Sequence, residues 1–453
     1  MDTMKDHAGL AVSGATADGL VAFERAAYEL RCLVDDPVAS IDAAIAAAPA
    51  MPMAHLLKAW LMLLGTEPAG LGPARECVAA AAMLPANERE RGHLAAATAL
   101  VDGRWFDASR LLEDVAIHFP HDALALQAGH QIDFFTGRRR LLRDRIARAL
   151  PHWSPSLPGY HALLGMHAFG LEENGDYDAA ERQGQRAVER EPRDSWAWHA
   201  VAHVHEMRNA PDAGIAWLGP HEATWSAGSF LGVHNHWHLA LFHLERDEHD
   251  VVLARYDAAI GGPGSAIVLD LIDASAMLWR LQLRGVDVGD RWQPLAERWL
   301  PVADAGNYAF NDLHAMLAFV GAGHADGQQR VLAAQQRALH GDGDNRTFTA
   351  EVGDPAVRAV HAFGAGDPAQ AVELLRPIRE YAYRFGGSHA QRDLLDLTLI
   401  EAALRSGDAA LAAALTAERS ALRPRSPLAG RFAARAQALA SAPASASALS
   451  LAA

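Results

Sequence analysis

Two stretches of the chain, GRWFDASRLLEDVAIHFP (residues 103–120) and GDYDAAERQGQRAVEREP (residues 175–192), share one pattern. In each stretch a glycine precedes an aromatic residue and a small alanine, and a proline follows 17 positions after the glycine. Glycine commonly ends one helix, alanine lets two helices approach, and proline ends the second helix. The two copies begin 72 residues apart, which equals two units of 36. This pattern is typical of a tetratricopeptide repeat.

Helical periodicity extends over the rest of the chain. Segments such as LLKAWLMLL (residues 56–64) and DLLDLTLIEAAL (residues 393–404) repeat apolar residues at helical spacing, and few runs alternate with a period of two. Weaker copies of the repeat begin at Gly366 and Gly407. We therefore predict an all-α fold, a tetratricopeptide-like helical-repeat superhelix (α-solenoid) with a concave inner face.

The length of the chain fits one continuous array. At 453 residues it exceeds an ordinary single core, and no internal linker is long enough to divide it. We expect a flexible N-terminus over residues 1–18 and a continuous repeat domain over residues 19–432. Residues 433–453 are rich in alanine and serine, so we expect a frayed tail there.

Charge and cysteine content narrow the class of protein. The chain has 55 acidic and 40 basic residues, a net charge of -15, and its one arginine run, Arg138 to Arg140, is local. We therefore expect no nucleic-acid partner. Two cysteines build neither a disulfide framework nor a cysteine zinc site. Without an apolar run of the roughly 18 residues that span a membrane, we predict a cytoplasmic protein with no membrane partner; apolar repeat ends make a homodimer plausible.

Histidines gather in two segments, SWAWHAVAHVHEM (residues 195–207) and FLGVHNHWHLALFHLE (residues 230–245). A helix with 3.6 residues per turn places His199 and His203 on one face of the first segment and His234 and His238 on one face of the second. Neighbouring tryptophans favour partial burial of both stripes. The remaining histidines of the two segments lie on other faces, which favours a structural or surface role: His205, His236 and His243.

The two stripes suit either of two chemistries. Paired histidines with an orienting carboxylate form an acid/base set near neutral pH, and no serine elbow, reactive cysteine or lysine stands beside them. The same imidazoles could instead hold a divalent transition metal, with a carboxylate as further ligand or base. Seven residues are candidates for catalysis: His199, His203, Glu206, His234, His238, Asp270 and Asp312.

A second set of polar and aromatic residues is predicted to bind substrate. Asp270 lies in an apolar helical segment, where a buried carboxylate needs a partner, although a surface face is an equally good interpretation. His389, Arg392 and Asp393 share one helical face that could hold an anion or could form a salt bridge between repeats. The full set is Trp198, Asn235, Trp237, His314, His389, Arg392 and Asp393.

Motifs along nearly the whole chain resemble one family. They include AHLLKAWLMLL (54–64), LALQAGHQIDFFTG (124–137), GMHAFGLEENGDYDAAE (165–181), FNDLHAM (310–316) and GGSHAQRDLL (386–395), together with the two histidine segments. On these motifs the chain resembles the tetratricopeptide repeat protein 38 family. The resemblance implies a helical-repeat fold of cytoplasmic proteins and no settled reaction. His236 departs from the apolar or aromatic residue expected at its position.

Three functional hypotheses follow. The first is a hydrolase or lyase in which His203 and His238 act as acid and base, Glu206, Asp270 and Asp312 orient them, and Arg392 with His389 holds a small anionic or polar molecule. The second is a scaffold that binds a peptide or protein in an open groove. The third is a carrier or sensor of a small molecule or metal. A histidine lining enclosed by tryptophan favours the enzyme.

Overall fold

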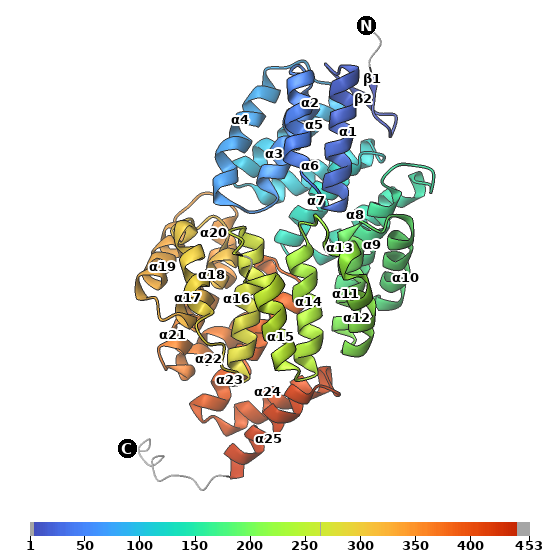
Figure 1. Cartoon of the computed structure of the whole chain (residues 1–453). Coiled ribbons are helices and arrows are strands. Elements are labelled where there is room, and N and C mark those ends of the chain that lie inside the picture. The colour runs from blue at the N-terminus through green and yellow to red at the C-terminus, as the bar shows by residue number, and fades with distance from the viewer. Residues whose placement is uncertain (1–3, 263, 442–453) are drawn as a thin grey trace.

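The computed structural model describes residues 4–262 and 264–441, and helices make up nearly all the regular structure of that part (Figure 1). The all-α prediction is confirmed. The first half of the chain forms α1 (Ala17–Cys32), α2 (Pro37–Ala47), α3 (Pro52–Leu63), α4 (Leu71–Ala82), α5 (Glu88–Val101), α6 (Trp105–His118), α7 (Ala123–Phe135), α8 (Arg139–Ala149), α9 (Tyr160–Glu173), α10 (Tyr177–Arg190), α11 (Ser195–Met207), α12 (Pro211–Leu218) and α13 (Glu222–Ser226).

The second half continues in the same way. It forms α14 (Gly232–Glu245), α15 (His249–Arg255), α16 (Val268–Leu283), α17 (Trp292–Trp299), α18 (Ala309–Gly321), α19 (Ala325–Leu339), α20 (Asn345–Phe348), α21 (Asp354–Gly364), α22 (Pro368–Ile378), α23 (His389–Ser406), α24 (Ala409–Leu422) and α25 (Pro427–Ser441). Short 3-10 or π turns join some of them, namely η1 (Pro68–Gly70), η2 (Leu150–His152), η3 (Gly219–His221), η4 (Tyr256–Ile260), η5 (Leu300–Val302), η6 (Thr349–Gly353) and η7 (Arg379–Phe385).

The two repeat motifs each build a pair of packed helices. Gly103 follows α5 and Gly175 follows α9, and both glycines have positive φ angles, 76° and 85°. The left-handed conformation turns the chain so that α6 packs on α5 and α10 packs on α9. In the second pair, a Cβ on Gly184 of α10 would lie 2.4 Å from Val201 of α11. Small residues in the motif therefore set how closely neighbouring helices approach.

The N-terminal segment differs from the flexible terminus expected for residues 1–18. β1 (Met4–Lys5) pairs antiparallel with β2 (Ala11–Val12), and Val12 is buried. The amide of Ser13 donates a hydrogen bond of 2.8 Å to Glu90 of α5, and Thr16 caps α1. The hairpin is fixed by contacts with a helix 77 residues away, which local composition does not reveal.

The C-terminal segment is helical further than expected. α25 continues to Ser441, so the first part of the predicted tail, residues 433–441, is helix, and Ala436 is buried. The rest of the tail, residues 442–453, lies outside the described residues.

Helices far apart in the chain meet at the middle of the molecule. The hydroxyl of Tyr308, next to α18, donates a hydrogen bond of 2.9 Å to the carbonyl of Phe135 in α7, and the Tyr308 ring stacks on Trp105 at 5.5 Å. The end of η7 closes on the same place, because Gly386 lies against Tyr308 and Phe135. Figure 1 shows the N-terminal helices at one end of the elongated molecule and α24 and α25 at the other.

Helix α23 runs through the interior and packs on both α11 and α16. Trp279 of α16 donates its indole N–H to Thr398 of α23 at 3.0 Å. Arg280 donates to the carbonyl of Ala390 at 2.5 Å. These contacts fill the space behind the two histidine segments with the chain itself.

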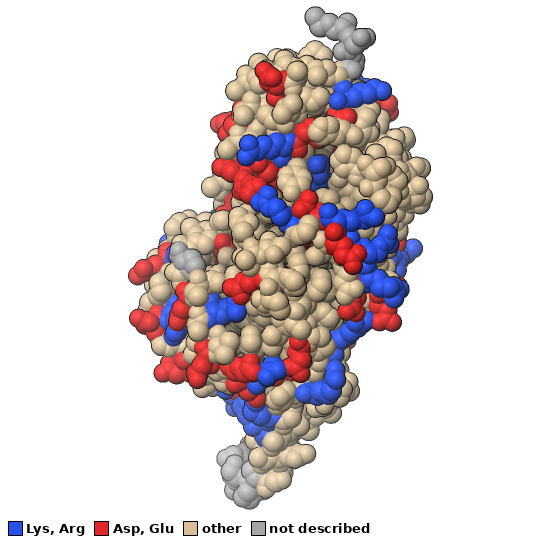
Figure 2. Space-filling view, turned by 45° about the vertical axis from the view of Figure 1, so that its right-hand side comes forward, with Lys and Arg blue, Asp and Glu red and all other residues tan. Residues whose placement is uncertain are grey.

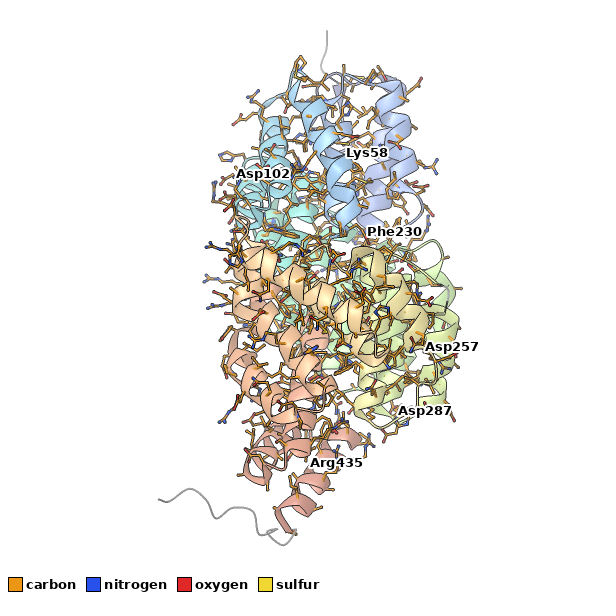
Figure 3. All side chains as sticks on the ribbon, turned by 90° about the vertical axis from the view of Figure 1, so that its left-hand side faces the viewer. Lys58, Asp102, Phe230, Asp257, Asp287 and Arg435 are labelled. Atoms are coloured by element: carbon orange, nitrogen blue, oxygen red, sulfur yellow. The ribbon has the colours of Figure 1, made fainter. Side chains whose placement is uncertain are left out.

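Side chains fill the space between the helices, and charged groups lie both in the interior and at the periphery. Figure 3 shows Lys58, Asp102, Asp257 and Arg435 at the outside of the molecule, and Phe230 where the N-terminal helices meet the rest. Acidic and basic groups are both distributed over the face shown in Figure 2. Among the described residues, no helix combines the length and apolar character needed to cross a membrane.

Replacing Gly386 by alanine should destabilise the protein more than replacing Gly407. Gly407 (φ 80°, ψ 8°) is left-handed helical, where alanine costs about 1 kcal/mol, whereas Gly386 (φ 87°, ψ -160°) has a conformation that essentially only glycine adopts. A Cβ on Gly386 would also lie 2.0 Å from the Tyr308 hydroxyl, whereas one on Gly407 meets nothing within 4 Å. We expect Gly386→Ala to lose about 1 to 3 kcal/mol more in urea unfolding. Equal losses would contradict the close packing at this junction.

Candidate functional site

Four imidazoles from α11 and α14 converge in the interior. Asp194 caps α11 by accepting from the amide of Ala197, and the 3.6-residue turn then aligns His199 with His203 on the side that faces α14. The ring centroids of His199 and His203 are 4.4 Å apart, as are those of His203 and His238. One ring nitrogen from each of His199, His203, His234 and His238 lies within 4.8 Å of the other three. The predicted meeting of the two histidine stripes is confirmed, and we call these four residues the four-histidine centre.

One pair of nitrogens is especially close. Nε2 of His199 lies 3.1 Å from Nε2 of His234. Two nitrogens that bind one tetrahedral zinc ion at 2.0–2.1 Å lie about 3.3 Å apart. This pair of nitrogens therefore has nearly the spacing of two zinc ligands before either side chain moves.

Burial disfavours the charged form of three of the four imidazoles. His199, His203 and His238 are buried, and the side chain of His234 is 15% exposed. Desolvation, followed by repulsion from neighbouring histidines, lowers the pKa of each of the three buried imidazoles well below its ordinary value. Neutral imidazole is the form that binds a metal.

Several nitrogens of the centre lack hydrogen-bond partners among the described residues. Both ring nitrogens of His203 and of His238 are in this state, as is Nδ1 of His199. A buried polar atom left unpaired costs roughly 1 to 3 kcal/mol. Five such atoms in one place point to a ligand that the side chains themselves do not provide.

Two acidic residues lie beside the histidines, and one of them, Asp273, is close enough to orient a ring by a hydrogen bond. Nδ1 of His234 lies 2.8 and 2.9 Å from the oxygens of Asp273 on α16, so this nitrogen carries the proton and donates it. Nδ1 of His203 lies 3.7 Å from Glu172 of α9. Carboxylates behind histidine ligands fix the ring and leave Nε2 free for a metal. Asp270 was expected to orient His203 and His238; the carboxylate that the structure places against the centre is Asp273, one helical turn further along α16, and it contacts His234.

Glu172 is the least satisfied acid of the site. It is fully buried, and neither of its side-chain oxygens has a hydrogen-bond partner among the described residues. Desolvation, with repulsion from Glu173, raises its pKa well above the usual range. A cation bound by the neighbouring histidines would favour its ionised form.

Aromatic rings surround the centre. Phe169 of α9 stacks on His199 at 5.4 Å, and Trp237 lies nearly parallel to His234 at 5.3 Å. Trp196 contacts His199 with ring centroids 5.0 Å apart. Trp198, predicted to bind substrate, instead packs on Trp217 at 4.5 Å, away from the histidines. The helical spacing of three residues between Trp196 and His199 is the signal that identifies the correct tryptophan.

Asp270 lies at the outer edge of the site. Ser265 donates a hydrogen bond of 2.6 Å to it, and His234 and Asp273 are among the charges that act on it. Desolvation is the main cause that raises its pKa to about 6. Asn235, predicted to contact substrate, donates to the carbonyl of Ser195 at 3.4 Å and ties α14 to α11.

Glu206 does not join the histidines as predicted. Its carboxylate lies 3.1 Å from Arg423, which also donates to its carbonyl at 3.0 Å. Glu206 stands near the C-terminal end of α11, where the helix faces the loop after α24. Across the helix pair, Glu172 of α9 takes the place beside His203 that the spacing within α11 had suggested for Glu206.

Asp312 and His314 of α18 are buried outside the four-histidine centre. Gln335 of α19 donates to Asp312 at 3.0 Å, and desolvation raises the pKa of this carboxyl to about 7. Nδ1 of His314 donates to the carbonyl of Phe310 at 2.8 Å, and desolvation lowers its pKa to about 4. The catalytic and binding roles predicted for these two residues have no counterpart in this geometry.

His389, Arg392 and Asp393 bind protein groups. His389 donates its amide to Glu173 at 3.0 Å, and Arg392 lies 3.5 Å from the same carboxylate. Asp393 contacts Arg419 and lies 3.4 Å from Arg280. The salt-bridge interpretation of this trio is the one that the contacts support.

Comparison with known proteins adds no assignment: a scan of the chain against models of protein families finds no match. The site is therefore interpreted from its own geometry.

Replacing Asp312 by asparagine should change the pH dependence of stability. Burial holds the pKa of folded Asp312 at about 7, above its usual value of 3.8, so the wild type loses stability as pH rises between these values. Asparagine still accepts from Gln335 but does not ionise. We expect the free energy of unfolding of Asp312→Asn, relative to wild type, to rise by on the order of 3 kcal/mol between pH 4 and 7. A difference that is constant with pH would contradict the raised pKa.

Proposed function

We propose that the four-histidine centre binds one divalent transition-metal ion and that the protein is a metal-dependent hydrolase or lyase acting on a small polar molecule. The observation that carries the proposal is the convergence of four nitrogens within 4.8 Å, from His199, His203, His234 and His238. Imidazole sets of this kind suit zinc, copper, iron and nickel.

The donor set fits such an ion in three respects. Three of the imidazoles are kept neutral, because burial lowers the pKa of His199, His203 and His238. Unpartnered nitrogens face one another, and a cation would satisfy them together. Asp273 accepts a hydrogen bond from Nδ1 of His234 and fixes that ring, and Glu172 lies 3.7 Å from Nδ1 of His203.

The edge of the site provides the residues for a reaction. A metal there would polarise a substrate oxygen or a water molecule. Asp270, with a pKa of about 6, can hold or accept a proton near neutral pH beside His234, the one partly exposed histidine of the centre. Because the centre is largely buried and His234 is 15% exposed, the proposed substrate is a small polar molecule, and the reaction is directed by water or by proton transfer.

The wider identity is part of the same proposal. We infer that the packed helix pairs form a tetratricopeptide-like solenoid, on the strength of the repeat motifs and their resemblance to the tetratricopeptide repeat protein 38 family. Cys32 and Cys77 are both unpaired and buried, which fits the reducing compartment of a cytoplasmic protein. A peptide scaffold is less well supported, because α23 packs on α11 and α16 and occupies the inner face that a peptide would need.

Metal binding should depend on the histidines of the centre and not on their helical neighbours. We expect the untagged protein, reconstituted with cobalt(II) or zinc(II), to hold about one ion per chain. His238→Gln should weaken binding at least about 100-fold, and Asp273→Asn about 10- to 100-fold. His236→Gln is the matched control, because His236 lies on the same helix but packs on Trp225.

Elemental analysis and the visible spectrum of the cobalt form give the measurement. Equal metal content in His238→Gln and His236→Gln would remove the metal assignment, since the two variants differ in whether the centre keeps its four nitrogens.

Turnover should follow the same residues. With 4-nitrophenyl acetate and 4-nitrophenyl phosphate as probes, we expect the metal-loaded wild type and His205→Gln to turn over at similar rates, and His203→Gln to lose at least about 100-fold in kcat/KM. Asp270→Asn should remove a step near pH 6 from the pH profile of kcat/KM, because that carboxyl has a pKa of about 6. Full turnover in His203→Gln would overturn the enzymatic role of the centre.

A further inference from the structure

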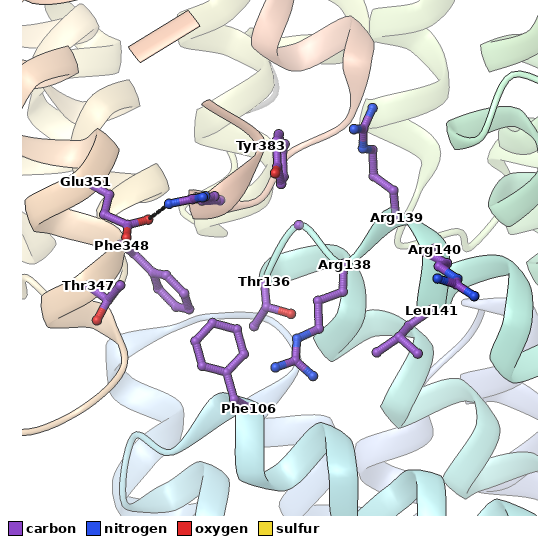
Figure 4. Close-up of a pocket in the computed structure, with 12 residues that line it drawn as sticks. Phe106, Thr136, Arg138, Arg139, Arg140, Leu141, Thr347, Phe348, Glu351 and Tyr383 are labelled. Atoms are coloured by element: carbon purple, nitrogen blue, oxygen red, sulfur yellow. Dashed lines mark hydrogen bonds and ion pairs between the residues drawn. The ribbon is translucent and has the colours of Figure 1, made fainter. Parts of the chain in front are cut away.

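A second concave site lies away from the four-histidine centre. It is a cleft of about 540 Å³ between α6, the start of α8, and the segment from α20 to η7 (Figure 4). None of its lining residues belongs to the centre: Phe106, Thr136, Gly137, Arg138, Arg139, Arg140, Leu141, Thr347, Phe348, Glu351, Tyr383 and Arg384. The volume falls within the range of about 300 to 1,000 Å³ that small-molecule sites occupy.

Two arginines of the cleft keep uncompensated charge. Among the described residues, no carboxylate lies within 4.0 Å of the guanidinium of Arg138 or Arg139. Arg138 instead lies over the ring of Phe106 at 4.4 Å, and Arg139 over the ring of Tyr383 at 4.9 Å. The neighbouring Arg140 differs, because it pairs with Asp144 at 3.1 Å. In a protein with a net charge of -15, this is a local site for an anion.

The start of α8 strengthens the preference for an anion. Arg138 occupies the N-cap, no side chain caps the helix, and its first turn holds no acidic residue. The N-terminus of a helix carries a partial positive charge, so the positive charges of arginines at this end are repelled by it. A bound anion would be attracted by the arginines and by the helix N-terminus. The arginine run is therefore costly to the fold by itself and favourable when an anion is bound.

Aromatic rings form the other part of the lining. Phe106 packs edge-on against Phe348 at 5.7 Å, and Figure 4 shows Phe106 and Tyr383 on opposite sides of the cleft. The backbone at the base is closely packed, because a Cβ on Gly137 would lie 1.8 Å from the carbonyl oxygen of Tyr383. Half-buried rings with guanidinium groups beside them suit a ligand that has a planar face.

We propose that this cleft binds a small organic phosphate that carries a planar ring, the chemistry of a mononucleotide. Arg138 and Arg139 supply positive charge from opposite sides of the cleft, over Phe106 and Tyr383, and the phosphate lies between them at the start of α8. The ring lies between Phe106 and Tyr383. Arg384 closes the rim while held by Glu351 at 3.1 Å.

Calorimetric titration of the full chain with AMP, adenosine and inorganic phosphate tests the proposal. We expect AMP to bind with a dissociation constant below about 1 mM, and adenosine and phosphate each at least about tenfold more weakly, because each supplies one half of the contacts. The double variant Arg138→Gln/Arg139→Gln should bind AMP at least about tenfold more weakly than wild type. Arg140→Gln, the matched control, should stay within about twofold, since Asp144 already neutralises that arginine.

Two results would overturn the assignment. One is the absence of saturable AMP binding to wild type, and the other is unchanged AMP affinity in the double variant. Phosphate that binds as tightly as AMP would refute the role of the rings. Thermal unfolding of each variant, expected near the wild-type Tm, shows that a lost affinity reflects lost contacts and not lost folding.

Discussion

The arrangement of the interior depends on the packing of four imidazoles between α11 and α14, three of which are buried. An ionised histidine is expensive in this environment, and desolvation lowers the pKa of His199, His203 and His238 well below the ordinary value. The rings of Phe169 and Trp237 exclude water from their faces. Helix α16 supplies one acceptor that water does not, Asp273 for His234, whereas Glu172 of α9 lies 3.7 Å from His203, beyond hydrogen-bond distance.

A layer of buried ion pairs separates this centre from the C-terminal helices. Glu173 meets Arg392, Glu206 meets Arg423, and Asp393 meets Arg419. Each of these three acids is paired with an arginine, because an unpaired charge in the interior is strongly destabilising. The arginines come from α23, from α24 and from the chain just after α24. These acids are therefore neutralised only when the C-terminal helices pack against the rest of the protein. The pairs hold α23 in the space where an open repeat array would present a groove.

Helical spacing predicts what lies on one face of one helix, and it succeeded for His199 with His203 and for His234 with His238. It failed where a contact depends on the rotation and offset between helices. Glu206 has the correct spacing from His203, yet Glu172 is the carboxylate that faces it, because α9 packs on that side of α11. Asp270 and Asp273 are one helical turn apart on α16. Which of them contacts His234 depends on how far α16 is shifted along α14, and Asp273 is the one that does. The repeat glycines correctly predicted where paired helices begin and end. Like the spacing of the histidines, this signal depends only on residues near one another in the sequence.

The tautomers of the centre favour a bound cation over a pair of acid/base histidines. Asp273 accepts a proton from Nδ1 of His234, so Nε2 of His234 presents a lone pair to Nε2 of His199 at 3.1 Å. If His199 donates there, its own Nδ1 becomes an unpaired acceptor in a dry interior, and if it does not, two lone pairs face each other. His238 has no partner for either nitrogen among the described residues and meets the same difficulty. No distribution of protons satisfies all of these nitrogens, whereas a cation bound by one nitrogen of each ring would satisfy four of them together and leave Asp273 on Nδ1 of His234.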